Sequence, residues 1–488
     1  DKRLEAGDVR LTMGGEPTFV SIDDFESAEW NSDAVGPTKR GLADQLMRRL
    51  QGKFSTGGLL HYGQGKWYPG ETLPRWTFSL YWRKDGHPIW RDPELLAKED
   101  THEDVGPDDA QALLTAIATS LEVPRENVLP AFEDPAEWII KEGNLPANVT
   151  PENSKLDDPE ERARIARVFE RGLTTPAGYV LPVQRWQSRA SSRWMSEVWN
   201  MRRGQVFLVA GDSPVGYRLP LGTLPHVPEK DAYFITPQDP TEPRAPLPPT
   251  LEKPTEENPT DPQQPVAHRQ QGSAGQEQVE QTLGDLNGRV RTAISVEPRD
   301  GRLCVFLPPV ETLEDYLELI AAVEAGAKSI GRKVLIEGYA PPHDPRVEVM
   351  RIAPDPGVIE VNIHPAANWD ACVNTTQAVY EEARQCRLGA DKFMTDGRHT
   401  GTGGGNHVVV GGATPNDSPF LRRPDLLKSL ILFWQRHPSL SYLFAGTFVG
   451  PTSQAPRIDE ARHDVLYELE IALDQIWPPS EGATPPPW

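Results

Sequence analysis

A proline-rich stretch is the feature that most constrains how this 488-residue chain can fold. Twelve prolines fall between Pro225 and Pro265, and a Gln- and Gly-rich sequence follows around 270–281. Such a stretch buries too little apolar surface to offset the entropy lost on ordering. We therefore expect a linker or insertion at 225–290, between an N-terminal part at 1–224 and a C-terminal part at 291–488. A proline-rich docking segment is the alternative interpretation.

Composition narrows the class of protein. The formal net charge is −21, and hydrophobic residues make up 38% of the chain. A surface this acidic does not favour nucleic acid, whose phosphates need basic partners. No run approaches the ~20 apolar residues that cross a bilayer, no signal region is evident, and cysteines are scarce. We expect a cytoplasmic protein without nucleic-acid or membrane partners, and a chain cut at both ends from a longer one.

Periodicity predicts alternating strands and helices on both sides of the proline-rich stretch. Strand patterns occupy 9–23, 59–62, 77–83, 205–210, 302–307, 334–339, 348–352 and 358–363, and a glycine-rich hairpin pattern occupies 398–412. Helical patterns occupy 38–51, 107–121, 157–173, 311–327, 366–388, 424–437 and 459–476. This order predicts an α+β fold with helices packed on one face of an antiparallel or mixed sheet.

The strand at 358–363 is the first candidate site. Side chains alternate between the faces of a strand, so Glu360, Asn362 and His364 should point the same way. A carboxylate, an amide and an imidazole on one face suit a metal-lined active site. An ordinary solvated sheet face would show the same pattern.

The second candidate is the glycine cluster Gly403, Gly404 and Gly405, which precedes His407 and a β-branched strand. Glycine permits close approach of the backbone to a ligand and offers N–H donors to it. A plain turn is the alternative for such a cluster alone. The histidine that follows, and the acidic strand upstream across one helix, favour a binding loop.

This order resembles the glutamine synthetase superfamily, where a strand with a metal-binding glutamate leads through a long helix to a glycine-rich loop and a metal-binding histidine. The sequence GGEPTF at 14–19 also resembles that family's Glu-Pro-Glu-Phe strand. The resemblance implies metal binding by Glu16, Glu360 and His407. Thr18 stands where the family has a second acid, and Thr402 where it has an asparagine. Because Thr18 cannot supply this carboxylate, one metal site lacks a ligand unless Asp23, Asp24 or Asp355 provides it.

Longer phrases at 14–24, 61–71, 355–370 and 445–462 resemble a bacterial amidoligase family found with transglutaminase-like proteins. The resemblance implies a glutamine synthetase-like fold and an ATP-dependent carboxylate–amine ligase. It further implies an acyl phosphate, two metal ions (Mg²⁺ or Mn²⁺), and small-molecule or peptide substrates. The family continues into a further segment with a carboxylate and an arginine, so we expect metal or nucleotide binding, but no full turnover, from this chain alone.

Cationic residues that could serve such a reaction are Lys66, Arg75, Arg218 and Arg457. Lys66 is the strongest candidate because flanking glycines leave a nucleotide room to approach. The interpretation assigns Lys66 and Arg457 to catalysis, and Lys66, Arg218 and the three loop glycines to nucleotide binding. Structural ion pairs are the alternative role for each cation.

Three other functions fit parts of the sequence. A transglutaminase-like cysteine acyl transferase or peptidase would use Cys372 or Cys386 with an activating histidine. A zinc hydrolase would use His364, His399 and His407. A non-catalytic peptide-binding scaffold would explain the two threonine replacements. If the ligase interpretation is right, strands 9–23 and 358–363 belong to one sheet, and their acidic residues converge.

Overall fold

The computed structural model places most of the chain. It describes residues 1–14, 16–69, 71, 74–134, 174–187, 192–201, 203–211, 213–228, 235, 238–239, 242–249, 289–393, 397, 399–402, 407–437, 439, 467 and 471–476. The predicted helix at 157–173 and most of the one at 459–476 lie outside this part. No helix among the described residues is long and apolar enough to cross a membrane.

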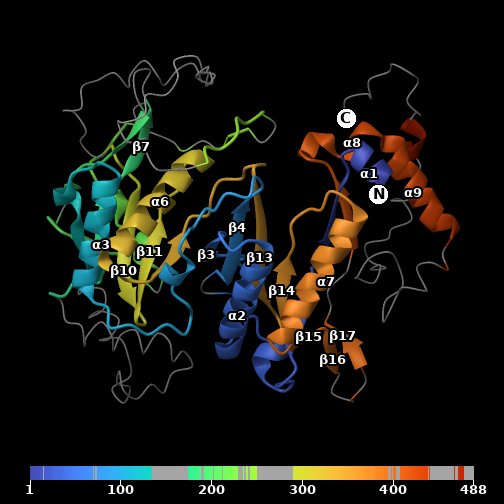
Figure 1. Ribbon diagram of the computed structural model, residues 1–488, viewed down its shortest axis with the longest axis horizontal. Helices are drawn as coiled ribbons and strands as arrows, with labels where there is room; N and C mark the ends of the chain where they lie inside the picture. Colours follow the sequence, from blue (N-terminus) through green and yellow to red (C-terminus); the bar gives the residue numbers. More distant parts are fainter. Residues whose placement is uncertain are drawn as a thin grey trace.

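A twelve-stranded mixed sheet forms the centre of the molecule (Figure 1). Its strands in spatial order are β15 (Leu388–Gly389), β2 (Thr18–Ser21), β14 (Val358–Asn362), β13 (Val347–Asp355), β4 (Trp76–Arg83), β3 (Leu59–Gln64), β12 (Val334–Gly338), β11 (Arg302–Leu307), β10 (Ala293–Arg299), β6 (Gly178–Pro182), β5 (Leu129–Glu133) and β9 (Val206–Leu208). The pairs β11–β12, β12–β3 and β5–β9 are parallel, and the other pairs are antiparallel.

Strands that precede the proline-rich stretch are interleaved in this sheet with strands that follow it. In particular, β2 pairs with β14, with Phe19 opposite Ile359 and Thr18 opposite Glu360. The prediction that these two segments share one sheet is therefore confirmed. The predicted single strand at 9–23 is wrong in one respect, because it is two strands in two sheets. Pro17, which has no N–H to donate, lies at the break between them.

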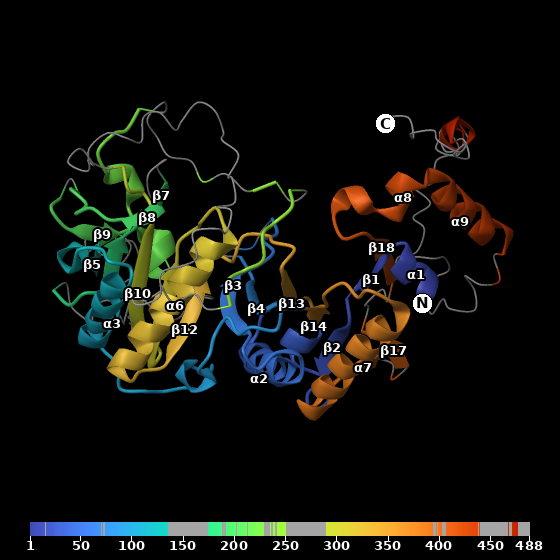
Figure 2. The ribbon, with the colours of Figure 1, turned by 45° about the horizontal axis from the view of Figure 1, so that its top comes forward.

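In the described part of the chain, three two-stranded ribbons accompany the central sheet. They are β1 (Arg10–Gly14) with β18 (His407–Gly411), β16 (Asp391–Phe393) with β17 (His399–Gly401), and β7 (Gln184–Gln187) with β8 (Ser192–Met195). The β1–β18 ribbon stands beyond one end of the sheet, next to α1, α8 and α9 (Figure 2).

Two pairs of helices lie along the sheet, α3 with α6 and α2 with α7, whereas α1, α8 and α9 lie beyond its end (Figures 1 and 2). The helices named in the described part of the chain are α1 (Lys2–Ala6), α2 (Pro37–Phe54), α3 (Pro107–Ser120), α6 (Leu313–Ile330), α7 (Trp369–Gln385), α8 (Pro419–Arg422) and α9 (Pro424–Arg436). Short 3₁₀ helices are η1 (Ala28–Trp30), η2 (Pro93–Leu95), η3 (Arg125–Asn127), η4 (Val215–Arg218), η5 (Leu221–Thr223) and η8 (Pro415–Asp417). In Figure 1, α3 and α6 lie beside β10 and β11, whereas α2 and α7 lie toward β13 and β14.

These helices cover both faces of the sheet, which corrects the expectation of one covered face. Tyr62 and Phe78 face α2, where Arg40 lies 4.9 Å from the Phe78 ring centroid. Tyr81 lies three residues beyond Phe78 in β4, so it points to the opposite face, and there it interacts with Tyr316 of α6. Central strands such as β11 are buried throughout, and strands buried on both faces read as continuous apolar runs.

Local signals explain where α6 begins and ends. The Thr312 side chain accepts a hydrogen bond from the Asp315 N–H (3.1 Å) at its start. Gly331 ends the helix in the left-handed conformation (φ 66°), which glycine adopts without a Cβ penalty. Between these caps the buried face includes Leu317, Ile320 and Val323, which join the main core.

Part of the predicted linker packs against the sheet. Residues 242–249 form no helix or strand. Leu247 is nonetheless buried in the main core. Arg83 of β4 donates to the Pro248 oxygen (2.8 Å), and Arg346 donates to the Ala245 oxygen (2.7 Å). These contacts tie a short piece of the 225–290 segment to the α6 face, while most of 229–288 lies outside the described residues.

Candidate active site

Glu360 of β14 forms the centre of the candidate site. It is 7% exposed, and its Oε2 atom accepts a hydrogen bond from Lys66 Nζ at 2.9 Å. Burial raises the pKa of Glu360, the Lys66 contact opposes this, and the charges of Asp355 and Glu16 raise it further. Two further carboxylates therefore act on Glu360 here, with Lys66 as a partly exposed counterion.

A β-bulge aims Lys66 at Glu360. The Gly65 N–H donates to the Arg75 oxygen (2.6 Å), and the Arg75 N–H donates to the Lys66 oxygen (2.9 Å). Two residues of one strand thus face one residue of the other, which is the pattern of a bulge. Gln64 is paired with Trp76, and its side chain points to the α2 face. Regular alternation would place the Lys66 side chain on that same face, because Lys66 lies two residues beyond Gln64. The extra residue turns Lys66 to the Glu360 face.

The space at the bulge favours glycine at position 65. A Cβ there would overlap Oγ1 of Thr77, well inside 3.0 Å. Gly65 therefore has a structural role in addition to leaving space around Lys66.

Arg75 links the β3–β4 loop to the β13–β14 hairpin. Its guanidinium forms an ion pair with Asp355 at the end of β13 and donates from Nε to Glu71 Oε1 (2.8 Å). It also lies 4.4 Å from the Tyr68 ring centroid, in cation–π geometry. The loop that presents Lys66 is thus held against the strands that present Asp355 and Glu360.

Lys39 of α2 supports the same hairpin from within the protein. Its ammonium donates to the main-chain oxygens of Asp33 (2.9 Å), Ala34 (3.0 Å) and Asp355 (2.8 Å). Burial lowers the pKa of Lys39 to about 8, against the opposing charges of Glu29 and Asp355. Because its hydrogen bonds all go to backbone carbonyls, Lys39 positions the hairpin and is closed to ligands.

The start of the glycine-rich loop contacts β2. Thr402 donates to the main-chain oxygen of Thr18 (3.0 Å), and the two hydroxyl oxygens lie 2.6 Å apart. On the far side of the loop, the His407 backbone pairs with Gly14 in the β1–β18 ribbon. Both ends of the loop therefore lie beside the segment that carries Glu16. The side chain of His407, the glycines at 403–405 and Arg457 lie outside the described part.

Two predicted residues lie elsewhere. Arg218 forms an ion pair with Glu133 of β5 and donates from Nε to the Val209 oxygen (2.7 Å), at the opposite end of the sheet. His364 packs against Phe54 and Trp82, with ring centroids 5.6 and 5.0 Å away. Trp82 is on the α2 face, so the prediction that His364 shares the Glu360 face is wrong. β14 ends at Asn362, and beyond that point strand alternation no longer applies.

Three acids were proposed to compensate for Thr18, and two of them have partners other than Glu360. Asp23 accepts from Arg387 Nε (2.6 Å), and Asp24 accepts from the main-chain N–H groups of Glu26 and Ser27. Of these three acids, Asp355 is the one whose charge is shown to act on Glu360. It is therefore the acid that could take the place of the missing carboxylate.

The described side chains fit a divalent cation in part. The Glu360 carboxylate, on which the charges of Glu16 and Asp355 act, has the oxygen ligands that a hard cation prefers. Within the described residues, no group of three or more His, Cys, Asp or Glu side chains is close enough to hold one. A complete centre would need a further ligand, and the predicted one is His407.

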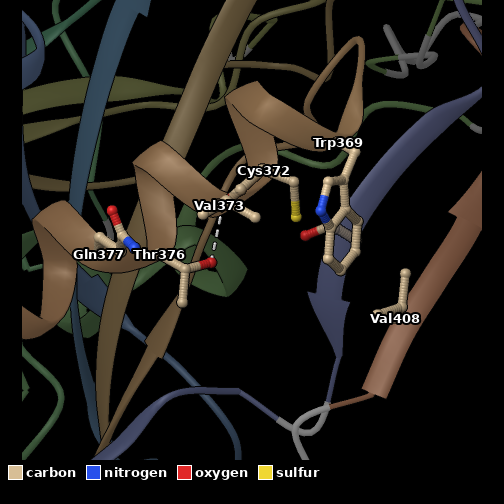
Figure 3. Close-up of a pocket in the computed structure, with 7 residues that line it drawn as sticks. Trp369, Cys372, Val373, Thr376, Gln377 and Val408 are labelled. Carbon is tan, nitrogen blue, oxygen red and sulfur yellow. Dashed lines mark hydrogen bonds between the residues drawn. The ribbon is translucent and has the colours of Figure 1, made fainter. Parts of the chain in front are cut away.

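A small apolar cavity of about 130 Å³ lies between α7 and the β1–β18 ribbon. The Cys372 thiol and the Trp369 ring line it, together with Val408 (Figure 3). Burial raises the pKa of Cys372, and it raises that of Cys386 to about 11. Neither thiol has the lowered pKa of a cysteine nucleophile, which argues against the cysteine-enzyme interpretation.

Two lysines near the site, Lys39 and Lys392, were not predicted from the sequence. Lys39 lies in a helix rich in charged residues, where a solvent-exposed lysine is the ordinary expectation. Lys392 lies in the two-stranded ribbon β16–β17, and no periodic pattern predicted its strand. The clearest missed signal is the pair Gly63 and Gly65, because glycine inside a strand often marks a bulge.

Together, the fold and the site define an α+β protein whose large mixed sheet carries a cluster of paired acids and bases at its β2–β14 end. The chain belongs to the family described as "Putative amidoligase enzyme (DUF2126)", whose model matches residues 1–488. This match confirms the family resemblance seen in the sequence. No curated protein matched the chain, and no solved structure did.

Proposed function

We propose that this chain contributes the active site of an ATP-dependent carboxylate–amine ligase of glutamine synthetase-like type, acting in the cytoplasm. The observation that supports it most is the convergence at Glu360. Lys66 reaches this carboxylate through a β-bulge, Asp355 and Glu16 act on it, and the glycine-rich loop starts beside it at Thr18. The family description names the amide-forming chemistry.

The reaction would proceed in two steps. A substrate carboxylate oxygen forms a bond to the γ-phosphorus of ATP, and the bond from that phosphorus to the bridging oxygen breaks, releasing ADP. The nitrogen of an amine then attacks the acyl carbon of the acyl phosphate, phosphate leaves, and the amine proton passes to solvent. The carboxylate and the amine would belong to small molecules or peptides.

The residues of this chain would mainly position the substrates and help to neutralise the charge of the phosphate groups. Glu16 and Glu360, with His407, would hold Mg²⁺ or Mn²⁺, which when bound neutralises phosphate oxygens and polarises the transferred phosphoryl group. Lys66 would exchange its contact with Glu360 for one with a phosphate oxygen. Arg75 would keep Asp355 in place and hold the loop that carries Lys66.

Metal binding gives the first test. Glu360→Gln removes the charge and keeps the shape, so Mn²⁺ affinity measured by calorimetry should fall at least tenfold, or about 1.4 kcal/mol. Glu381→Gln, on an exposed part of α7 with its own Arg384 partner, is the matched control. Equal Mn²⁺ affinity in the wild type and Glu360→Gln would remove Glu360 from the site.

Turnover gives the second test and separates a ligase from a cysteine enzyme. In the intact protein, with any transglutaminase-like cysteine inactivated, phosphate release and amide formation should both require ATP. They should survive Cys372→Ala and Cys386→Ala and collapse in His407→Ala, because acyl-phosphate chemistry needs no protein nucleophile. Amide formation without ATP that is lost with either cysteine would establish the cysteine enzyme instead.

A further inference from the structure

Lys392 of β16 lies over the tip of the β13–β14 hairpin, close to the candidate site. A Cβ built on Gly357 would be 2.7 Å from Lys392 Nζ. Gly357 has φ 70° and donates its N–H to the Asp33 oxygen (3.1 Å), so the tip is fixed in place beneath the ammonium group. The Lys392 side chain is half-buried.

Lys392 differs from the other cations around this hairpin. Lys66 pairs with Glu360, Arg75 pairs with Asp355 and Glu71, and Lys39 is bound by three carbonyl oxygens. Among the described residues, no carboxylate forms an ion pair with Lys392. Burial lowers its pKa without an opposing acidic group. A partly desolvated ammonium without a counterion is stabilised by binding an anion.

Lys66 and Lys392 lie near hairpin residues that are three positions apart in the sequence. Lys66 contacts Glu360 within β14, whereas Lys392 lies over Gly357 in the turn that precedes β14. At ~3.4 Å per residue, these two backbone positions are about 10 Å apart. Arg75 lies beside Asp355, on the opposite strand at the Lys392 end. A single phosphate group bound beside Glu360 or Gly357 would contact one of these lysines, whereas a chain of linked phosphates would contact both.

We propose that Lys392 binds the polyphosphate chain of the nucleotide, at the hairpin tip, while Lys66 binds the chain near Glu360. This inference rests on the proposed function, because it concerns the same ATP site. It adds a phosphate-binding residue from β16, and it predicts that ligands with linked phosphates are recognised in preference to single phosphates.

The test compares inorganic tripolyphosphate with orthophosphate, each with Mg²⁺, by calorimetry on the full chain. Lys392→Gln should lower tripolyphosphate affinity about tenfold, or ~1.4 kcal/mol, and change orthophosphate affinity by less than about twofold. Lys392→Arg keeps the charge and should retain tripolyphosphate affinity to within about threefold. Lys328→Gln, an exposed lysine on α6, is the matched control and should bind both ligands as the wild type does.

The outcomes separate the two proposals. If the wild type binds tripolyphosphate and Lys392→Gln binds it equally well, with an unchanged urea midpoint, the Lys392 inference is overturned and the proposed function stands. If Lys392→Gln weakens binding but Mn²⁺ affinity is insensitive to Glu360→Gln, the anion site stands and the proposed metal site fails. Equal losses in Lys392→Gln and Lys392→Arg would overturn the inference, because charge would not be the cause.

Discussion

Replacing Gly65 by alanine should destabilise the protein through one identifiable contact. The new Cβ would overlap Oγ1 of Thr77, whereas its next neighbours, Cβ of Thr77 and the Arg75 oxygen, would lie 3.3 and 3.4 Å away. Overpacking of this kind costs about 1–3 kcal/mol. A Gly→Ala change also recovers about 0.4–1 kcal/mol from the unfolded state where the backbone conformation is compatible. We expect a net loss of about 1–2 kcal/mol.

Removing the clashing hydroxyl should reverse most of this loss. In a Thr77→Ala background, the alanine at position 65 would meet only contacts of 3.3 Å or more. The double-mutant cycle should therefore give a coupling free energy of about 1 kcal/mol or more. Urea denaturation followed by far-UV circular dichroism and by tryptophan fluorescence would measure the four proteins. An equal cost of Gly65→Ala in both backgrounds would refute the bulge as the reason for glycine.

Two further predictions concern the hairpin that the site depends on. Gly357→Ala should cost about 1–3 kcal/mol, because a left-handed conformation is unfavourable with a Cβ and that Cβ would lie 2.6 Å from the Asn31 oxygen. Gly331→Ala has a similar φ without a close neighbour, so an equal or larger urea-midpoint shift in this control would contradict the contact argument. For Lys39, burial lowers the pKa from 10.5 to about 8, so between these pH values the unfolded chain binds this proton and the folded protein does not. Stability should therefore rise with pH in this window, by up to ~3 kcal/mol at ~1.4 kcal/mol per pKa unit. The free energy of unfolding of the wild type, taken relative to that of Lys39→Met, should rise from pH 8 to 10.5, and a difference that does not change with pH would show that Lys39 stays charged in the folded protein.

Helices with strong apolar periodicity could be predicted from the sequence to within a few residues. The patterns at 38–51, 107–121 and 311–327 correspond to α2, α3 and α6. That 9–23 and 358–363 share one sheet was predicted as well, from the family resemblance and the acidic character of both segments; their direct pairing as β2 and β14 was not predicted, since periodicity alone does not specify partners across a long insertion. Which face each helix covers was predicted wrongly. Continuous apolar runs such as β11 carry no alternation that would have shown both faces to be buried.

The candidate site was harder to predict because its geometry depends on departures from regular structure. The alternation of side chains between the two faces of a strand holds for Glu360, within β14. It fails to predict the face of His364, because the strand has already ended at Asn362. It also fails at Lys66, which a bulge turns to the other face. Lys392 belongs to a three-residue strand with no pattern of its own. Each of these positions is decided by backbone hydrogen bonds between distant segments, which a local sequence pattern does not encode.

The two threonine replacements acquire a common explanation from their contact. Thr18 and Thr402 stand where the glutamine synthetase-like pattern has an acid and an asparagine, and here their hydroxyls lie 2.6 Å apart. A carboxylate at position 18 would stand directly opposite Glu360 in the β2–β14 pair, and like charges at such positions destabilise a sheet unless a cation lies between them. With a neutral pair of hydroxyls, the loop is fixed to β2 without that requirement. The negative charge for a second metal ion would then have to come from Asp355, which Arg75 holds on the same face of the hairpin as Glu360.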